Sequence, residues 1–303
     1  MLPRQGKALF AVCLPLAAGT ASIAFSWLRW IDPFVDSGHE LDVPARLAAG
    51  ERLYRDVNCN YGPAGPWLNA LALRYWGHRF ATLEIVGLLL SIAILGLLFW
   101  LTVRAGSFLS AVVATTLTAA ICLGAPWGGA FIFPYAFANL YSLAGSLLAV
   151  LCFGREPARG RSLVLAALGL VLSMTARPEL GIATALILLL AGLRSADWRR
   201  GGRNSLFVAG GAGAASLAIY AAAFAGIPWQ TLRREVPFLH LGSLPPEWHQ
   251  LYRAASGLLH PLIALRFVGV GAVAGALLLA LFAWAWPGAP AGGDETPEAR
   301  RRI

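Results

Sequence analysis

Charged residues are scarce in this chain of 303 residues. Asp, Glu, Lys and Arg together make up 13% of it, and Lys7 is the single lysine. A soluble domain carries about twice that charged fraction. Hydrophobic residues make up 58% of the chain and the mean hydropathy is +0.65, which excludes an ordinary soluble globular protein.

Cysteines are few, and their positions do not indicate pairing. Cys13, Cys122 and Cys152 lie inside apolar runs, where a cysteine serves as a small buried hydrophobic residue. Cys59 is alone in its polar segment. The four cysteines therefore predict no disulfide framework.

A concentrated basic patch is also missing, although the formal net charge is +9. The arginines are spread over many polar segments and are not interleaved with aromatic residues, as they would be on a nucleic-acid-binding surface. We therefore expect no nucleic-acid partner.

The chain has instead a series of long apolar runs. A helix of about twenty apolar residues spans the core of a bilayer. The runs lie at 8–30, 82–103, 107–124, 131–153, 162–176, 180–193, 205–226 and 262–286. They predict an all-α, polytopic transmembrane protein with about eight spans. The fifth and sixth runs are short and could form one broken helix, which would leave seven spans.

The first run does not end like a signal peptide. Trp27, Arg29 and Trp30 form an interfacial anchor where a signal peptide would have small residues and a cleavage site. We therefore predict that this segment is a retained helix.

Arginines predict the orientation in the membrane. With eight spans and a cytoplasmic N-terminus, every short inner loop is basic, as the positive-inside rule requires. Residues 1–286 then form one transmembrane module with outer loops at 31–81 and 227–261. The Pro/Gly-rich, charged segment 287–303 is predicted to be a disordered cytoplasmic tail. The strong preference for arginine over lysine suggests a GC-rich bacterial genome, and hence a multi-pass protein of the bacterial inner membrane with both termini in the cytoplasm.

The first outer loop is predicted to be structured. Pro44 suits an early helical position and Gly50 a helix stop, which predicts a short helix over 43–49. Residues 66–76 repeat apolar side chains at helical spacing, which predicts an amphipathic helix on the membrane surface.

Acidic residues are concentrated in the same loop. It contains six of the fifteen carboxylates of the chain, namely Asp32, Asp36, Glu40, Asp42, Glu51 and Asp56. Asp36 and Glu40 are four residues apart, so they share a face if the segment is helical. Two such carboxylates can bind a divalent metal ion, or one can act as a general base while the other tunes its pKa. Solvated loop acids are the alternative.

A longer pattern surrounds these acids. The segment 36–77 reads DSGHELDVPARLAAGERLYRDVNCNYGPAGPWLNALALRYWG, with the stretches GERLYRD and YGPAGPWLNA leading into the second apolar run. It resembles the first outer loop of the GT-C superfamily of integral-membrane glycosyltransferases, in the branch of the dolichyl-phosphate-mannose and aminoarabinose transferases and their bacterial relatives. The stretches FPYAFANLYSLAG (133–145) and ARPELGIATA (176–185) also look like later helices of that family. At 303 residues the chain would be a short or truncated member of that family.

The resemblance implies an activity and a site. Such enzymes transfer a sugar from a polyprenyl-phosphate donor to a glycan, lipid or protein acceptor on the outer face of the membrane. An aspartate in the first outer loop is the catalytic base or, in some branches, a metal ligand. Asp36 occupies that position and Glu40 is the second candidate. Asp32 and Asp42 follow as reserves, because the acids here are spaced out where the family often has adjacent ones.

The leaving phosphate requires cationic partners, and the planar fork of arginine suits it. Arg177 beside Glu179 is one candidate, with a structural ion pair as the alternative. Arg233 and Arg234 are the others, with snorkelling to lipid headgroups as the alternative. Tyr61 is a candidate platform for a sugar ring. No cofactor is firmly indicated beyond a divalent metal ion at Asp36 and Glu40.

The predicted function is therefore that of a membrane glycosyltransferase. A different class remains open: a non-catalytic membrane protein, such as a lipid-linked-sugar transporter, an assembly subunit or a degenerate transferase copy. The centres of the apolar runs are almost purely Leu, Ala, Val and Gly, which favours chemistry at the bilayer edge over passage through it. Gly210, Gly211 and Gly213 fit close helix packing.

Overall fold

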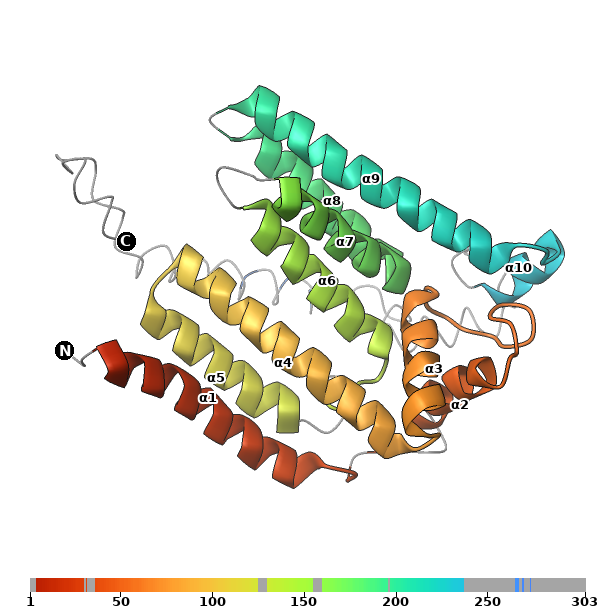
Figure 1. The fold of residues 1–303 in the computed structure, drawn as a ribbon, viewed down its shortest axis with the longest axis horizontal. Helices are drawn as coiled ribbons and strands as arrows, with labels where there is room; N and C mark the ends of the chain where they lie inside the picture. Colours follow the sequence, from red (N-terminus) through yellow and green to blue (C-terminus); the bar gives the residue numbers. More distant parts are fainter. Residues whose placement is uncertain are drawn as a thin grey trace. The chain divides into compact units, whose positions relative to one another are not determined.

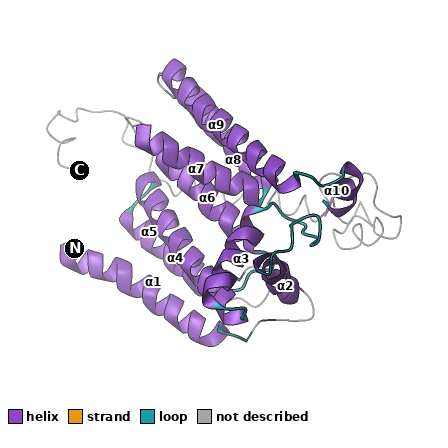
Figure 2. Cartoon of the chain, turned by 45° about the vertical axis from the view of Figure 1, so that its right-hand side comes forward, coloured by secondary structure: helices purple, strands orange, loops and turns teal. Residues whose placement is uncertain are grey.

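The computed structural model describes residues 4–29, 31, 36–124, 130–154, 160–195 and 197–236, together with 265, 266, 269 and 273. Within this part of the chain the secondary structure is helical, with one isolated bridge between Leu53 and Val57 and no strand (Figure 2). The helices are α1 (Arg4–Ser26), α2 (Asp36–Ala48), α3 (Ala64–Trp76), α4 (Phe80–Ala105), α5 (Phe108–Gly124), α6 (Phe137–Phe153), α7 (Gly160–Ala176), α8 (Pro178–Leu193), α9 (Trp198–Phe224) and α10 (Trp229–Glu235) (Figure 1). The all-α prediction is confirmed for these residues.

Seven of the ten helices coincide with the predicted apolar runs. In the described residues two of them, α4 and α9, are long and apolar enough to cross a membrane by length and composition. Five shorter apolar helical stretches lie in α1, α5, α6, α7 and α8. The predicted eighth span at 262–286, apart from four helical residues, and the predicted tail at 287–303 lie outside the described residues.

The chain divides into two compact units, Met1–Leu239 and His240–Ile303. All ten helices belong to the first unit. Within it, α1 packs on α5, α5 on α4, and α4 on α6 (Figure 1). The Ser26 hydroxyl on α1 donates to the Leu123 carbonyl of α5 at 2.7 Å.

Helices α7 and α8 form a hairpin and not one broken helix. Arg177 alone joins them, and its extended backbone (φ −142°, ψ 100°) turns the chain. The hydroxyls of Ser173 on α7 and Thr184 on α8 lie 2.9 and 2.8 Å from that of Ser146 on α6. Ser173 comes before Arg177 and Thr184 after it, yet both contact Ser146, so α8 runs back along α7. This hairpin favours eight separate apolar runs over seven.

Glycine lets α6 and α7 approach each other closely. A Cβ atom added at Gly145 would lie 2.4 Å from the Gly169 carbonyl oxygen. The glycines that the sequence suggested for such packing are on α9. No described atom lies within 4 Å of a Cβ built on Gly210, Gly211 or Gly213, so among the described residues they make no close approach.

The polar segments between the apolar helices build a small core of their own, which we call the loop core. It joins α2, the segment 50–63, the end of α9 and α10. Its buried residues are Val43, Leu53, Tyr54, Val57, Cys59, Ala223, Ile227, Leu232 and Val236. The first predicted outer loop therefore packs against the described beginning of the second.

Helix α2 is longer than the sequence predicted. It starts at Asp36 and not near 43, so Pro44 lies inside the helix. Asp36 in the first turn favours this start, because a carboxylate interacts well with the positive end of the helix dipole. Pro44 is buried, and its packing compensates for the missing N–H group. Gly50 has a φ of +103°, in agreement with the predicted stop.

Candidate functional site

The acidic pair of the first loop lies on one face of α2. Asp36 is exposed, and within the described residues no cation forms an ion pair with it. Glu40 follows one turn later, close enough for the charge of Asp36 to raise the pKa of its carboxyl group. The two acids therefore share a face, as their spacing predicted.

Glu40 bridges α2 and α6. One of its carboxylate oxygens accepts a hydrogen bond of 3.1 Å from the backbone N–H of Phe137, the first residue of α6. Burial raises the pKa of Glu40 from 4.5 to about 7, against the opposing effect of this hydrogen bond. The carboxylate thus caps the N-terminus of a helix from another element, a role that needs no substrate.

A narrow cavity surrounds the Glu40 side chain. Its volume of about 10 Å³ offers room for roughly one water molecule. Cys59 lines it, and burial raises the pKa of that thiol to about 12, which keeps the thiol protonated and unreactive at neutral pH. Asn69 also lines it and accepts a 2.8 Å hydrogen bond from the Tyr141 hydroxyl.

Arg177 lies at the same end of the helices. Its guanidinium donates a hydrogen bond to the side-chain oxygen of Asn139 on α6 and forms an ion pair with Glu179. It also stacks over the ring of Tyr61, 5.5 Å from the ring centre. The ion pair that the sequence left as the structural alternative is present, and a cation–π contact accompanies it.

Tyr61 links the acidic pair to Arg177. Burial raises the pKa of its hydroxyl, the nearby Tyr135 and Glu40 raise it further, and Arg177 lowers it. The structure thus brings together Glu40, Tyr61, Arg177 and Glu179 from α2, the loop before α3 and the α7–α8 turn, with Asp36 one turn before Glu40 on α2. We call this group the acid–arginine cluster.

The backbone holds Tyr61 in this place. The N–H of Gly62 donates a 3.0 Å hydrogen bond to the carbonyl of Ala176 at the end of α7. A Cβ atom at Gly62 would lie 2.1 Å from the Thr175 carbonyl oxygen, so this close approach requires glycine. The hydroxyl of Tyr54 donates to the Tyr61 carbonyl at 2.6 Å from the other side.

The other two predicted arginines are on α10. Leu232 and Val236 attach this helix to the loop core, and Arg233 is exposed. Within the described residues no hydrogen bond or ion pair joins Arg233 to the acid–arginine cluster. The side chain of Arg234 lies outside the described residues.

An apolar groove lies between α3 and α4. Its volume is about 540 Å³, and hydrocarbon and aromatic side chains line it almost throughout. The lining residues are Leu68, Leu71, Ala72, Tyr75, Trp76, Val86, Leu89, Leu90 and Tyr141. We refer to it as the α3–α4 groove.

Sequence reasoning overlooked a second buried carboxylate. Glu84 in the first turns of α4 is 1% exposed and accepts a 2.8 Å hydrogen bond from the backbone N–H of Leu28, beyond the end of α1. Leu28 has a φ of +55°, a conformation that a leucine adopts only when its surroundings hold it there. An acid inside the apolar run 82–103 was the available signal.

The described residues contain no group of three or more His, Cys, Asp and Glu side chains that could hold a metal ion. Asp36 and Glu40 offer two carboxylates, and the hydrogen bond from Phe137 already occupies one oxygen of Glu40. Asp32, a further predicted acid, lies outside the described residues.

Comparison with known proteins found no family model, no curated protein and no solved structure that matches this chain. The site therefore has to be interpreted from its own residues and from the sequence motifs around them.

Proposed function

We propose that this chain is an integral-membrane glycosyltransferase of the GT-C type, which moves a sugar from a polyprenyl-phosphate donor to an acceptor hydroxyl at the outer face of the membrane. The observation that carries the proposal is the acid–arginine cluster. It places an aromatic ring and a guanidinium together beside Glu40, whose neighbour one turn away on α2 is the exposed Asp36, although the residues come from segments more than a hundred positions apart.

Asp36 is the proposed base. It takes the proton of the acceptor hydroxyl while that oxygen attacks the anomeric carbon of the donor sugar. The bond between the anomeric carbon and the phosphate oxygen breaks, and its electron pair leaves with the polyprenyl phosphate. Asp36 suits this role better than Glu40, because it is exposed and is not bound to a backbone N–H group.

Arg177 is the proposed partner of the departing phosphate. Asn139 and Glu179 hold its guanidinium in a fixed orientation, and a preorganised donor stabilises developing negative charge without reorganisation. Tyr61, under the same guanidinium, supplies an aromatic face for the sugar. Glu40 acts as a positioning residue that fixes α2, and with it Asp36, against α6.

The α3–α4 groove favours a donor that is attached to a lipid. A polyprenyl chain is a long hydrocarbon, and this groove offers it an apolar lining next to the helix that follows Tyr61. The lining includes Tyr75 and Trp76, which suit the level of the lipid headgroups.

The proposed topology has both termini in the cytoplasm and the loop core on the outer face of a bacterial inner membrane. Six apolar helices, α4 to α9, separate residue 31 from residue 227. If each of them crosses the membrane, the two loops are on the same side. The packing of both loops in one loop core supports this arrangement.

The test is turnover of a polyprenyl-phosphate sugar by the purified chain in lipid nanodiscs. Asp36→Asn should abolish transfer, whereas Asp42→Asn, an exposed acid of the same helix, should retain it. Wild-type turnover in Asp36→Asn would exclude Asp36 as the base. If the wild type binds the donor but never consumes it, the non-catalytic alternative holds. Chelation with EDTA would show whether a divalent metal ion takes part.

A further inference from the structure

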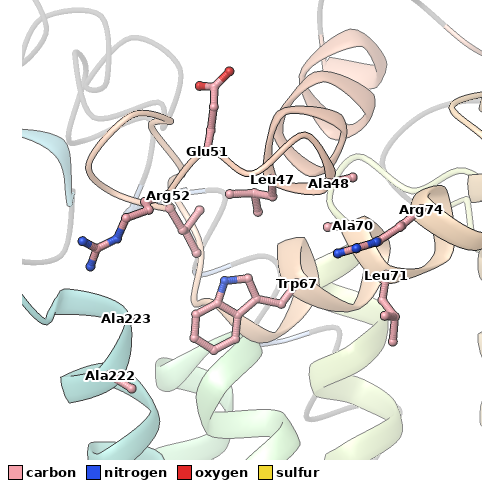
Figure 3. A pocket seen from close by; sticks show the side chains of 11 residues that line it. Leu47, Ala48, Glu51, Arg52, Trp67, Ala70, Leu71, Arg74, Ala222 and Ala223 are labelled. Carbon is pink, nitrogen blue, oxygen red and sulfur yellow. The ribbon is translucent and has the colours of Figure 1, made fainter.

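A further pocket lies on another side of α3, and none of its lining residues belongs to the acid–arginine cluster. Its volume is about 360 Å³, within the range of small-molecule sites. It lies between the end of α2, the segment after Gly50, one face of α3 and the last turn of α9 (Figure 3). We call it the α3–α9 pocket.

Helix α3 has three different faces. Gly65, Pro66 and Asn69 face the narrow cavity beside Glu40. Leu68, Ala72 and the two aromatic residues that follow face the α3–α4 groove. The remaining face, with Trp67 and Arg74 as its functional side chains, forms the floor of the α3–α9 pocket.

The charge of this pocket is positive. Arg52 and Arg74 line it together with the acid Glu51. The Glu51 carboxylate accepts a hydrogen bond of 2.9 Å from Arg46, so its charge is compensated from outside the pocket. In Figure 3 it points away from Trp67, whereas the guanidinium of Arg74 is directed toward the middle of the pocket.

The two arginines differ in their surroundings. Arg52 donates a hydrogen bond to the carbonyl of Ala225, which anchors its guanidinium at the end of α9. Within the described residues Arg74 has no ion pair and no side-chain hydrogen bond. Its guanidinium is exposed and none of its five N–H donors is bound to a described residue, and a carboxylate or phosphate matches their geometry.

Trp67 supplies the second recognition element. Its indole lies in the pocket between the two arginines (Figure 3) and is 39% exposed. A flat aromatic face of this kind packs against the C–H surface of a sugar ring, while guanidinium groups at either side bind its charged substituent.

We propose that the α3–α9 pocket binds an acidic sugar, that is, a sugar ring carrying a phosphate or carboxylate group, either free in solution or attached to a lipid. The pocket is separate from the acid–arginine cluster. The proposal requires that the chain bind such a sugar, not that it transfer one, so a failure of the proposed transferase activity would leave it standing.

Titration calorimetry on the full chain in nanodiscs tests this proposal. The probes are glucose 6-phosphate, neutral glucose, farnesyl-phosphoryl-glucose and farnesyl phosphate. We expect one or both of the charged sugars to bind and glucose to bind far more weakly. Arg74→Gln should weaken the binding about tenfold or more, the loss expected for a charge-assisted hydrogen bond. The two charged probes distinguish a free from a lipid-attached ligand.

Two further variants show whether a loss of binding comes from the pocket itself and not from misfolding. Ala222→Trp fills the pocket from α9 without changing any charge and should also abolish binding. Arg79→Gln removes an exposed charge just after α3 but outside the pocket, and should bind like the wild type. The proposal is overturned if neither charged sugar binds more tightly than glucose, if Arg74→Gln and Arg79→Gln behave alike, or if farnesyl phosphate is the one probe that binds.

Discussion

At the scale of single residues, two buried carboxylates hold the ends of helices. Glu40 accepts from the first N–H of α6, and Glu84 accepts from Leu28 beyond the end of α1. Neither contact could be predicted from the sequence, because each partner is a distant backbone group. The partner of Glu40 is almost a hundred positions away, and that of Glu84 is more than fifty positions away. Spacing along α2 predicted that Asp36 and Glu40 share a face. This spacing contained no information on which of the two carboxylates would accept a hydrogen bond from a distant helix.

Glu40 should make stability depend on pH. Its folded pKa of about 7 exceeds its ordinary value of 4.5, so the unfolded chain loses this proton first as the pH rises. Stability at this site is therefore fully present below pH 4.5, falls between 4.5 and 7, and is constant above 7. Glu40→Gln keeps an acceptor for the Phe137 N–H group without the ionisation. We expect the melting temperature of the variant to rise relative to that of the wild type over this interval.

The matched controls for this experiment are on the same helix. His39 lines the same cavity and is also titratable, so His39→Gln shows how much of the pH dependence belongs to the imidazole. Asp42→Asn removes an exposed carboxylate of the same helix and serves as the control for the loss of one acid on α2. If the gap between Glu40→Gln and the wild type were constant from pH 4.5 to 8, the carboxyl group would not titrate there.

At the scale of elements, the sequence predicted the positions of the helices along the chain better than the contacts between them. Apolar runs and a helical period located each of α3 to α9, because burial and periodicity are local properties, although the starts of α6 and α9 differ from the predicted ones by six and seven residues. The start of α2 was missed because Pro44 suggested a boundary that tertiary packing overrides. The glycine contacts were assigned to α9, whereas Gly145 and Gly169 make the close approach between α6 and α7. A glycine that allows close packing cannot be distinguished by sequence from one that faces lipid.

A pair of glycine substitutions separates these two kinds. Gly145→Ala places a Cβ atom 2.4 Å from the backbone of α7, whereas Gly210→Ala meets no described atom within 4 Å. Alanine is the better helix former by roughly 0.5–1 kcal/mol. We therefore expect a lower melting temperature for Gly145→Ala and an unchanged or slightly higher one for Gly210→Ala, measured in the same detergent. Equal effects would mean that α6 and α7 do not pack through this contact.

At the scale of the whole molecule, the loop core determines which topologies are acceptable. It joins residues of the first polar loop to residues after α9, and such a core forms only if both segments emerge on one side of the bilayer. Charge along the sequence predicted that arrangement through the positive-inside rule, which does not depend on packing. For the proposed membrane topology, two independent physical effects, the distribution of arginine and the burial of apolar loop residues, both require the two loops to lie on one side.

Labelling of single cysteines tests this sidedness directly. In a variant without the four native cysteines, Asn58→Cys in the loop core and Gln230→Cys on α10 are both exposed. A membrane-impermeant maleimide should modify both in intact spheroplasts. Ser107→Cys between α4 and α5 and Trp198→Cys at the start of α9 should react after permeabilisation and not before. Reaction of Asn58→Cys and Gln230→Cys from opposite sides would contradict an even number of crossings between them. Reaction of all four from outside would contradict the membrane-spanning arrangement, because the loop core and the opposite helix ends would then share one aqueous phase.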